Sequence, residues 1–284
     1  MAKVSFTNSE VIFATNHSKA LAAKEPFSRI LNATVNELTI DSDSLGTFSG
    51  EVERQGSMLD ALRAKIKLAQ NATEARFVMA SEGSFGSADG LGFASQGIEL
   101  LLLSDRATGA EILEQQISWH TNYSTATLST DDELLSFLNR IGFGSHALVL
   151  YPQGIAPSEL VYKGIVELSD AQRAFKDCVR LSPHGKAVAM SDMRAHLNPT
   201  RMLNIGECCE LLAKRLATPC PSCGSGGFGL GETISGLPCE GCGAPTQRAV
   251  AEWHGCPFCK ERARKPRSDG VTKASAAECE WCNP

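Results

Sequence analysis

The segment GTFSGEVERQGSMLDALRAKIK, from Gly46 to Lys67, decides how the rest of the sequence is interpreted. It begins with glycines and two carboxylates, Glu51 and Glu53, which favour a tight acidic turn. Ser57 and the aspartate three residues later form a capping-box pattern, and apolar residues then recur at helical spacing. Carboxylates in a turn, with cations such as Arg63 on the next helix, suit a divalent metal and a polyphosphate. A solvated hairpin followed by an exposed helix face is the alternative.

The composition indicates a globular protein with one large core or two smaller ones. The chain has 284 residues, 43% of them hydrophobic, and a net charge of −5, whereas a bulk nucleic-acid binder would usually be basic. The N-terminus has no secretory pattern, and the longest apolar run, Ile98 to Leu103, is too short to span a bilayer. We therefore expect a cytoplasmic protein without a membrane partner.

Two apolar runs end in polar residues where a parallel sheet would place a ligand. The run Val11 to Ala14 leads directly into Thr15, Asn16 and Lys19 and then a predicted helix. Such a strand, loop and helix start favours an anion, because free backbone N–H groups and the helix dipole point at the loop. The alternative is an ordinary connection with Asn16 as the helix cap. The second run, Arg76 to Ala80, is followed by Ser81 and Glu82, so that a carboxylate lies at the end of a buried strand. The alternative is that Glu82 is a solvated acid in a turn.

A basic cluster precedes the last long helix of the predicted first domain. Arg194, His196 and Arg201 surround Asn198 and Pro199, which are typical of a helix start. They favour an anion site, although an exposed helix start with solvated cations fits as well. Between the segments described above, alternating strand and helix patterns fill the sequence. We predict an α/β domain over residues 1–216, with a mixed sheet and flanking helices.

The order of these motifs resembles the inosine/xanthosine triphosphate pyrophosphatase superfamily of nucleotide hydrolases. The matching features are the Thr15-Asn16-His17-Ser18-Lys19 loop, the acidic segment with its helix, and the Ser81-Glu82-Gly83 strand end. They span about the first ninety residues. The cluster around Arg194 resembles the superfamily's Ser-His-Arg cluster in position but not in order. Many members also carry two adjacent aspartates where this chain has Glu82 alone, which leaves the metal count and the general base open.

The resemblance implies a metal-dependent hydrolase that releases pyrophosphate from a nucleoside triphosphate or a related phosphoanhydride. Glu51, Glu53 and Glu82 would hold Mg²⁺ and carry the catalysis. The substrate-binding residues would then be Thr15, Asn16, Lys19, Arg63, Arg194, His196 and Arg201. The expected partner is a phosphorylated small molecule, and a homodimer is an open expectation.

The C-terminal region, residues 217–284, predicts a double zinc ribbon. Eight cysteines form four C-x-x-C pairs, the spacing of zinc ligands, and they satisfy two tetrahedral Cys₄ sites with none left over. Sequential pairing of the four motifs is simplest, but pairing the second with the third is also geometrically feasible. His254 could replace one cysteine. The ligands are Cys220, Cys223, Cys239, Cys242, Cys256, Cys259, Cys279 and Cys282.

Closed Cys₄ shells leave no open coordination position, so these zinc ions are expected to be structural. Basic residues crowd the region from Lys260 to Arg267. They support an alternative function for the chain: a non-catalytic module that binds nucleic acid or protein through the ribbons and the basic tail. A solvated hairpin that only supports the fold would carry the same residues.

Overall fold

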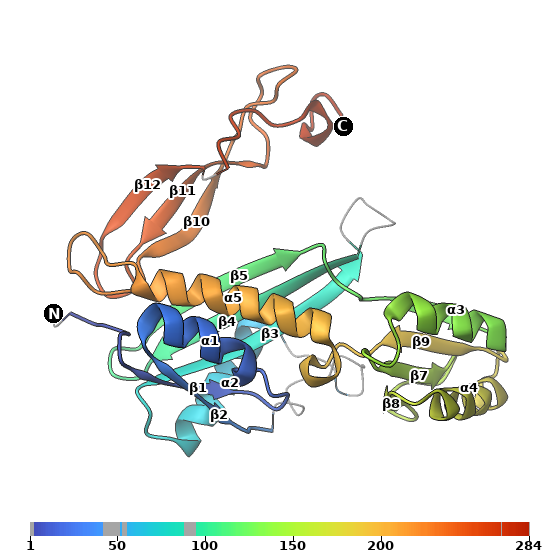
Figure 1. Ribbon diagram of the computed structural model, residues 1–284. Coiled ribbons are helices and arrows are strands. Elements are labelled where there is room, and N and C mark those ends of the chain that lie inside the picture. The colour runs from blue at the N-terminus through green and yellow to red at the C-terminus, as the bar shows by residue number, and fades with distance from the viewer. Residues whose placement is uncertain (1–2, 42–51, 53–55, 88–94, 268, 284) are drawn as a thin grey trace. The chain divides into compact units, whose positions relative to one another are not determined.

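The computed structural model describes residues 3–41, 52, 56–87, 95–267 and 269–283 (Figure 1). The chain divides into two compact units. One is Asn8–Ala213, and the other joins the residues through Thr7 to Lys214–Pro284. Helix α5, Pro199–Ala217, begins in the first unit and ends in the second. The predicted carboxylates Glu51 and Glu53 lie outside the described residues.

The first unit contains a five-stranded mixed sheet of order β2-β1-β3-β4-β5. Strand β1 pairs in parallel with β2 and β3, while β4 pairs antiparallel with β3 and β5. Because β3 continues well past the end of β1, it carries Glu82 from the parallel part of the sheet into a long antiparallel hairpin arm. The strands are β1 Glu10–Ala14, β2 Thr34–Leu38, β3 Phe77–Ser87, β4 Ser95–Asp105 and β5 Ala110–Ser118.

Helix α2, Met58–Ala72, packs on this sheet with the apolar face that its spacing predicts. Its buried Leu62, Ile66 and Ala69 share a core with residues of β3 and β4. The capping box between Ser57 and Asp60 is present, since each side chain bonds the other residue's backbone N–H. The cap fixes where the helix starts, and the apolar face fixes which side meets the sheet.

Helix α1, Ala20–Leu31, continues through Pro26. Proline removes the N–H that would bond the carbonyl of Ala22. That carbonyl faces Gly206 of α5, where an added Cβ would lie 3.8 Å from its oxygen. An added Cβ would thus make only an ordinary van der Waals contact, and α1 and α5 lie side by side at this point (Figure 1).

A second, four-stranded antiparallel sheet of order β6-β9-β7-β8 completes the first unit, where the sequence predicted a single mixed sheet. Helices α3 and α4 pack on it around a separate core that includes Phe137, Leu148 and Phe175 (Figure 1). The elements are β6 Thr125–Leu128, α3 Asp131–Ile141, β7 Leu148–Pro152, β8 Tyr162–Ile165, α4 Leu168–Leu181 and β9 Ala187–Ser191.

The second unit is built on a three-stranded antiparallel sheet in which each strand pairs with the next along the chain. The strands are β10 Gly229–Ser235, β11 Ala249–Gly255 and β12 Arg262–Pro266. Short 3₁₀ turns are Ala195–Leu197 in the first unit and Ala276–Glu278 in the second. Among the described helices, none combines the length and apolar character needed to cross a lipid bilayer.

Candidate functional site

The eight C-x-x-C cysteines gather into two four-thiol groups that can hold two zinc ions. Cys220 and Cys223 meet Cys256 and Cys259, and the other group is Cys239, Cys242, Cys279 and Cys282. The first motif therefore pairs with the third and the second with the fourth. Both pairings expected from the sequence, sequential pairing and second with third, are wrong.

The meander of the second unit explains this interleaved pairing. The first motif precedes β10, and the third lies between β11 and β12, so both stand at one end of the antiparallel sheet. The second motif, between β10 and β11, and the fourth, after β12, stand at the other end. A strand of seven residues such as β10 spans roughly 23 Å. That length separates the first motif from the second by far more than one zinc site can bridge.

The sulfur positions fit tetrahedral zinc. A zinc ion with Zn–S bonds of about 2.3 Å holds its sulfurs roughly 3.8 Å apart. In the first group Cys220 and Cys259 are 3.7 Å apart and Cys223 and Cys256 are 3.6 Å apart. In the second group the Cys239–Cys282 and Cys242–Cys279 distances are 3.8 and 3.6 Å. None of the eight cysteines forms a disulfide.

The backbone around the thiols also suits metal ligation. Gly224 and Gly243 follow the first two motifs with φ of 72° and 74°, a conformation that glycine adopts without strain. The backbone N–H groups of Gly241 and Phe258 point at Cys239 and Cys256 sulfurs at 3.3 and 3.4 Å, which stabilises thiolates. His254 belongs to neither group, and its Nε2 lies 3.0 Å from a carboxylate oxygen of Glu252.

A separate cluster of buried polar groups lies in the first unit, where the parallel part of the sheet ends. Lys19, at the start of α1, is only 6% exposed, and its Nζ donates to the Ser81 hydroxyl at 2.9 Å. Lys65 of α2 forms an ion pair with Glu82 and donates to the carbonyl of Ser81 at 3.3 Å. The loop after β1, the helix after the acidic segment and the end of β3 thus meet at one place.

Arg201 of α5 enters the same cluster through Glu99 of β4. Its Nε lies 2.7 Å from the Glu99 carboxylate, and both side chains are buried. The guanidinium also stacks over the ring of Phe85 at 4.9 Å. Gly83 leaves the space for this pair, because an added Cβ would lie 2.4 Å from a guanidinium nitrogen. The side chain of Asn198 accepts the backbone N–H of Arg201 and so anchors the start of α5.

Two histidines border the cluster. The rings of His17 and His196 stack with centroids 4.8 Å apart. Burial, then repulsion from Lys19 and other cations, lowers the pKa of His17 to about 3, and burial also lowers the pKa of His196. Nδ1 of His17 is buried and has no hydrogen-bond partner within the described residues. Arg194 pairs with Asp192 at 2.6 Å.

The cations of this cluster outnumber the carboxylates that pair with them among the described residues. Lys65, Arg201 and Arg194 each take one carboxylate, whereas no ion pair is recorded for Lys19 within the described residues. Burial, followed by repulsion from Arg201 and Lys65, lowers the pKa of Lys19 to about 7, although Glu99 and Glu82 act in the opposite direction. An anion placed here would restore the charged lysine, so the site is electrostatically suited to a phosphate chain.

The other predicted binding residues, Thr15, Asn16 and Arg63, lie outside the group of buried charges. Thr15 is buried, and its hydroxyl accepts the backbone N–H of His17, while Asn16 is exposed. Arg63 is exposed and pairs with Glu111 of β5 at 2.7 Å. These contacts support the loop and the α2 surface.

Sequence reasoning missed Glu99, and it gave no binding role to His17 and Ser81, although both lie in motifs that carry the resemblance. Glu99 carried a usable signal, because it is a single carboxylate inside the apolar run of β4, and a buried charge needs a partner. Its partner Arg201 lies 102 residues further along the chain, so the sequence did not show which cation it meets.

The described residues do not by themselves form a Mg²⁺ site. Within them, only the two cysteine groups bring three or more candidate metal ligands together. Glu82 and Glu99 are each committed to a cation.

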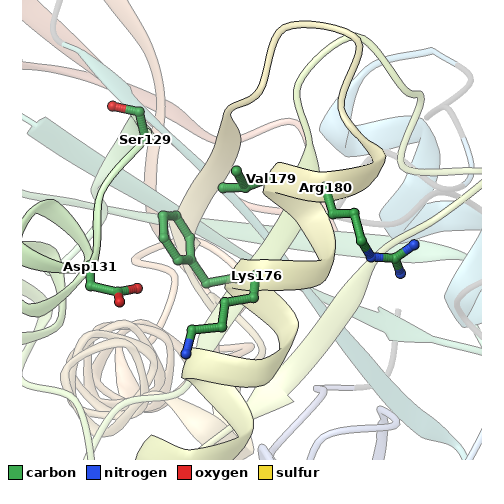
Figure 2. A pocket seen from close by; sticks show the side chains of 6 residues that line it. Ser129, Asp131, Lys176, Val179 and Arg180 are labelled. Carbon is green, nitrogen blue, oxygen red and sulfur yellow. The ribbon is translucent and has the colours of Figure 1, made fainter.

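An open pocket of about 300 Å³ lies between α3 and α4, away from all the predicted site residues (Figure 2). Asp131 lies across it from Lys176 and Arg180 of α4. The start of α3 is already capped by Thr130 and carries three acids in its first turn, which disfavours an anion there. This pocket therefore does not replace the buried cluster as the candidate site.

Comparisons with known proteins identify a family but no activity. No curated protein matches the chain. The family model described as "Domain of unknown function (DUF6671)" matches residues 65–284. The match includes Lys65, Glu82, Glu99 and Arg201 and all eight zinc-motif cysteines, and it begins after Lys19. Since the matched segment is well over half of the sequence, the chain belongs to the DUF6671 family.

Proposed function

We propose that the first unit hydrolyses a phosphoanhydride, most simply a nucleoside triphosphate, at the cluster of Lys19, Glu82 and Arg201. One observation carries the proposal: a buried lysine, with no carboxylate partner in the part of the chain that the structure describes, stands among Lys65, Arg201 and the two histidines. A buried cation surrounded by other cations is costly unless a ligand supplies negative charge.

The position of this cluster supports the proposal. Lys19 begins a helix directly after a parallel strand, a place where backbone N–H groups and the helix dipole favour phosphate. The resemblance to the inosine/xanthosine triphosphate pyrophosphatases supports it as well, because the described parts of its motifs, Lys19, helix α2 and Glu82, lie together here. The nucleotide pyrophosphatase-like fold is part of the same proposal.

In this proposal the chain's own groups have separate roles. Lys19 and Arg201 neutralise the phosphate chain, and neutral His196 donates a hydrogen bond to it, while Arg194 and Asp192 fix the loop that carries His196. Glu82 accepts a proton from the attacking water once the substrate draws Lys65 toward its phosphates. The new bond joins the water oxygen to the α-phosphorus, and the bond to the bridging oxygen breaks. Pyrophosphate leaves with the bridging oxygen, and a nucleoside monophosphate remains.

We include a Mg²⁺ requirement in the proposal, with Glu51 and Glu53 as the remaining carboxylates. A divalent ion would neutralise the developing phosphate charge. Because the described residues form no Mg²⁺ site, the requirement is tested by measuring the rate of hydrolysis as Mg²⁺ is added.

The test is a panel of nucleoside triphosphates incubated with purified protein and Mg²⁺, with products separated by anion-exchange chromatography. We expect monophosphate and pyrophosphate from at least one nucleotide. Glu82→Gln and Lys65→Met should lower kcat/KM at least tenfold, whereas Lys67→Met, an exposed lysine on the same helix, should not. No turnover of any nucleotide, or equal rates in Glu82→Gln and wild type, would refute the hydrolase.

A further inference from the structure

Strand β12 and the residues just before it concentrate positive charge at an edge of the sheet in the second unit. Arg262, Arg264 and Lys265 of β12 and Lys260 before it lie within six residues, and all four are exposed. The one acid among them, Glu261, is hydrogen-bonded to the hydroxyl of Ser222. Within the described part of the chain, β12 pairs with β11 alone, so its outer edge has no neighbouring strand.

The strand register places an aromatic side chain among these cations. Trp253 of β11 lies directly opposite Arg264, and the guanidinium of Arg262 stacks over its indole ring at 5.0 Å. Trp253, Arg262 and Arg264 occupy the same face of the sheet, because side chains two residues apart on a strand point to the same side. An aromatic ring flanked by arginines is what unpaired bases stack on, while the cations contact the phosphates.

The cations of this face are available for such contacts. Arg262 pairs with Glu232, but the two side chains are 53% and 68% exposed, so the pair contributes little and can be exchanged for a phosphate. No ion pair is recorded for Arg264 or Lys260 within the described residues. Zinc-bound Cys₄ groups carry a net charge of about −2 each, which would repel phosphates at both ends of the sheet. The binding strip is therefore the middle of β11 and β12.

We propose that this face of Trp253, Arg262 and Arg264, with Lys260 beside it, binds single-stranded nucleic acid. A single strand fits because its bases are free to stack on Trp253, whereas those of a duplex are not. The five residues of β12 span roughly 17 Å, enough for a few nucleotides, so the interaction is short and weak by itself. This inference does not depend on the hydrolase, whose residues all lie in the other unit.

The test is fluorescence anisotropy of a labelled twelve-nucleotide oligothymidylate titrated with the full, zinc-loaded chain. With about three phosphates contacted, the logarithm of affinity should fall with the logarithm of salt at a slope near −2. Raising the salt from 50 to 200 mM should then weaken binding by more than tenfold.

Charge-reversal variants locate the site. Lys260→Glu with Arg264→Glu should weaken binding at least tenfold. The matched control, Arg173→Glu with Lys176→Glu, reverses two exposed cations on α4 and should leave binding unchanged. A doubly substituted chain, Trp119→Phe with Trp281→Phe, keeps Trp253 as its one tryptophan, whose fluorescence should be quenched on binding. Zinc content and thermal midpoint establish that each variant is folded.

Four outcomes would overturn the inference: no binding at 50 mM salt, equal loss in the α4 control, equal affinity for a duplex of the same length, or unquenched Trp253 in the bound state. Binding of an acidic peptide at the β12 edge, with no binding of oligonucleotide, would also overturn it, because the partner would then be a protein.

Discussion

Replacing Lys19 by methionine should stabilise the folded protein at neutral pH while it weakens the binding of phosphate chains. Methionine keeps the length and apolar character of the lysine side chain but brings no charge into the interior. The pKa of Lys19 falls from 10.5 to about 7 on folding, mainly because of burial. The folded state therefore disfavours the protonated lysine that the unfolded chain carries.

The structure gives the size of this effect. A pKa difference of 10.5 minus about 7 corresponds to roughly 5 kcal/mol as an upper limit. The variant also loses the hydrogen bond from Lys19 to Ser81, which costs about 1–3 kcal/mol. We expect a net stabilisation of about 2 kcal/mol at pH 7. The free energy of unfolding of the wild type should rise between pH 7 and pH 10.5, because there the unfolded state binds the proton that the folded state has lost.

The assay is urea unfolding followed by helical circular dichroism, at pH 7 and pH 9. The helical signal reports mainly on the first unit, which contains α1 to α4 and most of α5. The advantage of Lys19→Met over wild type should shrink by about 2 kcal/mol between the two pH values. Lys24→Met, an exposed lysine on the same helix, should show neither the stabilisation nor the pH dependence. Equal stability differences at both pH values would refute the buried, proton-releasing lysine.

Two further predictions concern the zinc groups and the Arg201–Glu99 pair. Cys220→Ser with Cys256→Ser should lower bound zinc from two ions to one, whereas Cys220→Ser with Cys239→Ser should lose both, as measured by plasma mass spectrometry; the reverse pattern would restore sequential pairing. Gly83→Ala should destabilise the first unit by about 1–3 kcal/mol in urea unfolding, because its Cβ displaces Arg201 from Glu99. Gly86→Ala, where an added Cβ has open space, is the matched control, and equal effects of the two changes would contradict the close approach.

The parts of the fold that the sequence predicted are those that local residues determine. Helix α2 depends on its own cap and apolar spacing, and α3 likewise has a capping box, between Thr130 and Glu133, and a buried apolar face. Strand β6 was missed, because four residues give too short a pattern to distinguish from a loop. The division of the first unit into two sheets depends on which strands pair, and that is decided by long-range packing.

In the zinc groups and in the buried cluster, too, the sequence predicted what depends on local residues and missed what depends on distant partners. Cysteine spacing identified the zinc motifs, but their pairing follows from the three strands between them, which the sequence analysis did not identify. In the buried cluster, Lys19, Glu82 and Arg201 were named from local motifs. Glu99 was not, because its role depends on a partner more than a hundred residues away.

The most direct test of the proposed phosphate site is calorimetric titration of the protein with inorganic triphosphate at pH 8, without divalent metal, in buffers of different ionisation enthalpy. With a pKa of about 7, Lys19 is roughly nine-tenths neutral at this pH, so a bound anion should draw a proton onto it. The wild type should bind at least tenfold more tightly than Lys19→Met and take up nearly one proton more per triphosphate. Equal affinity and equal proton uptake in the two proteins would contradict the site.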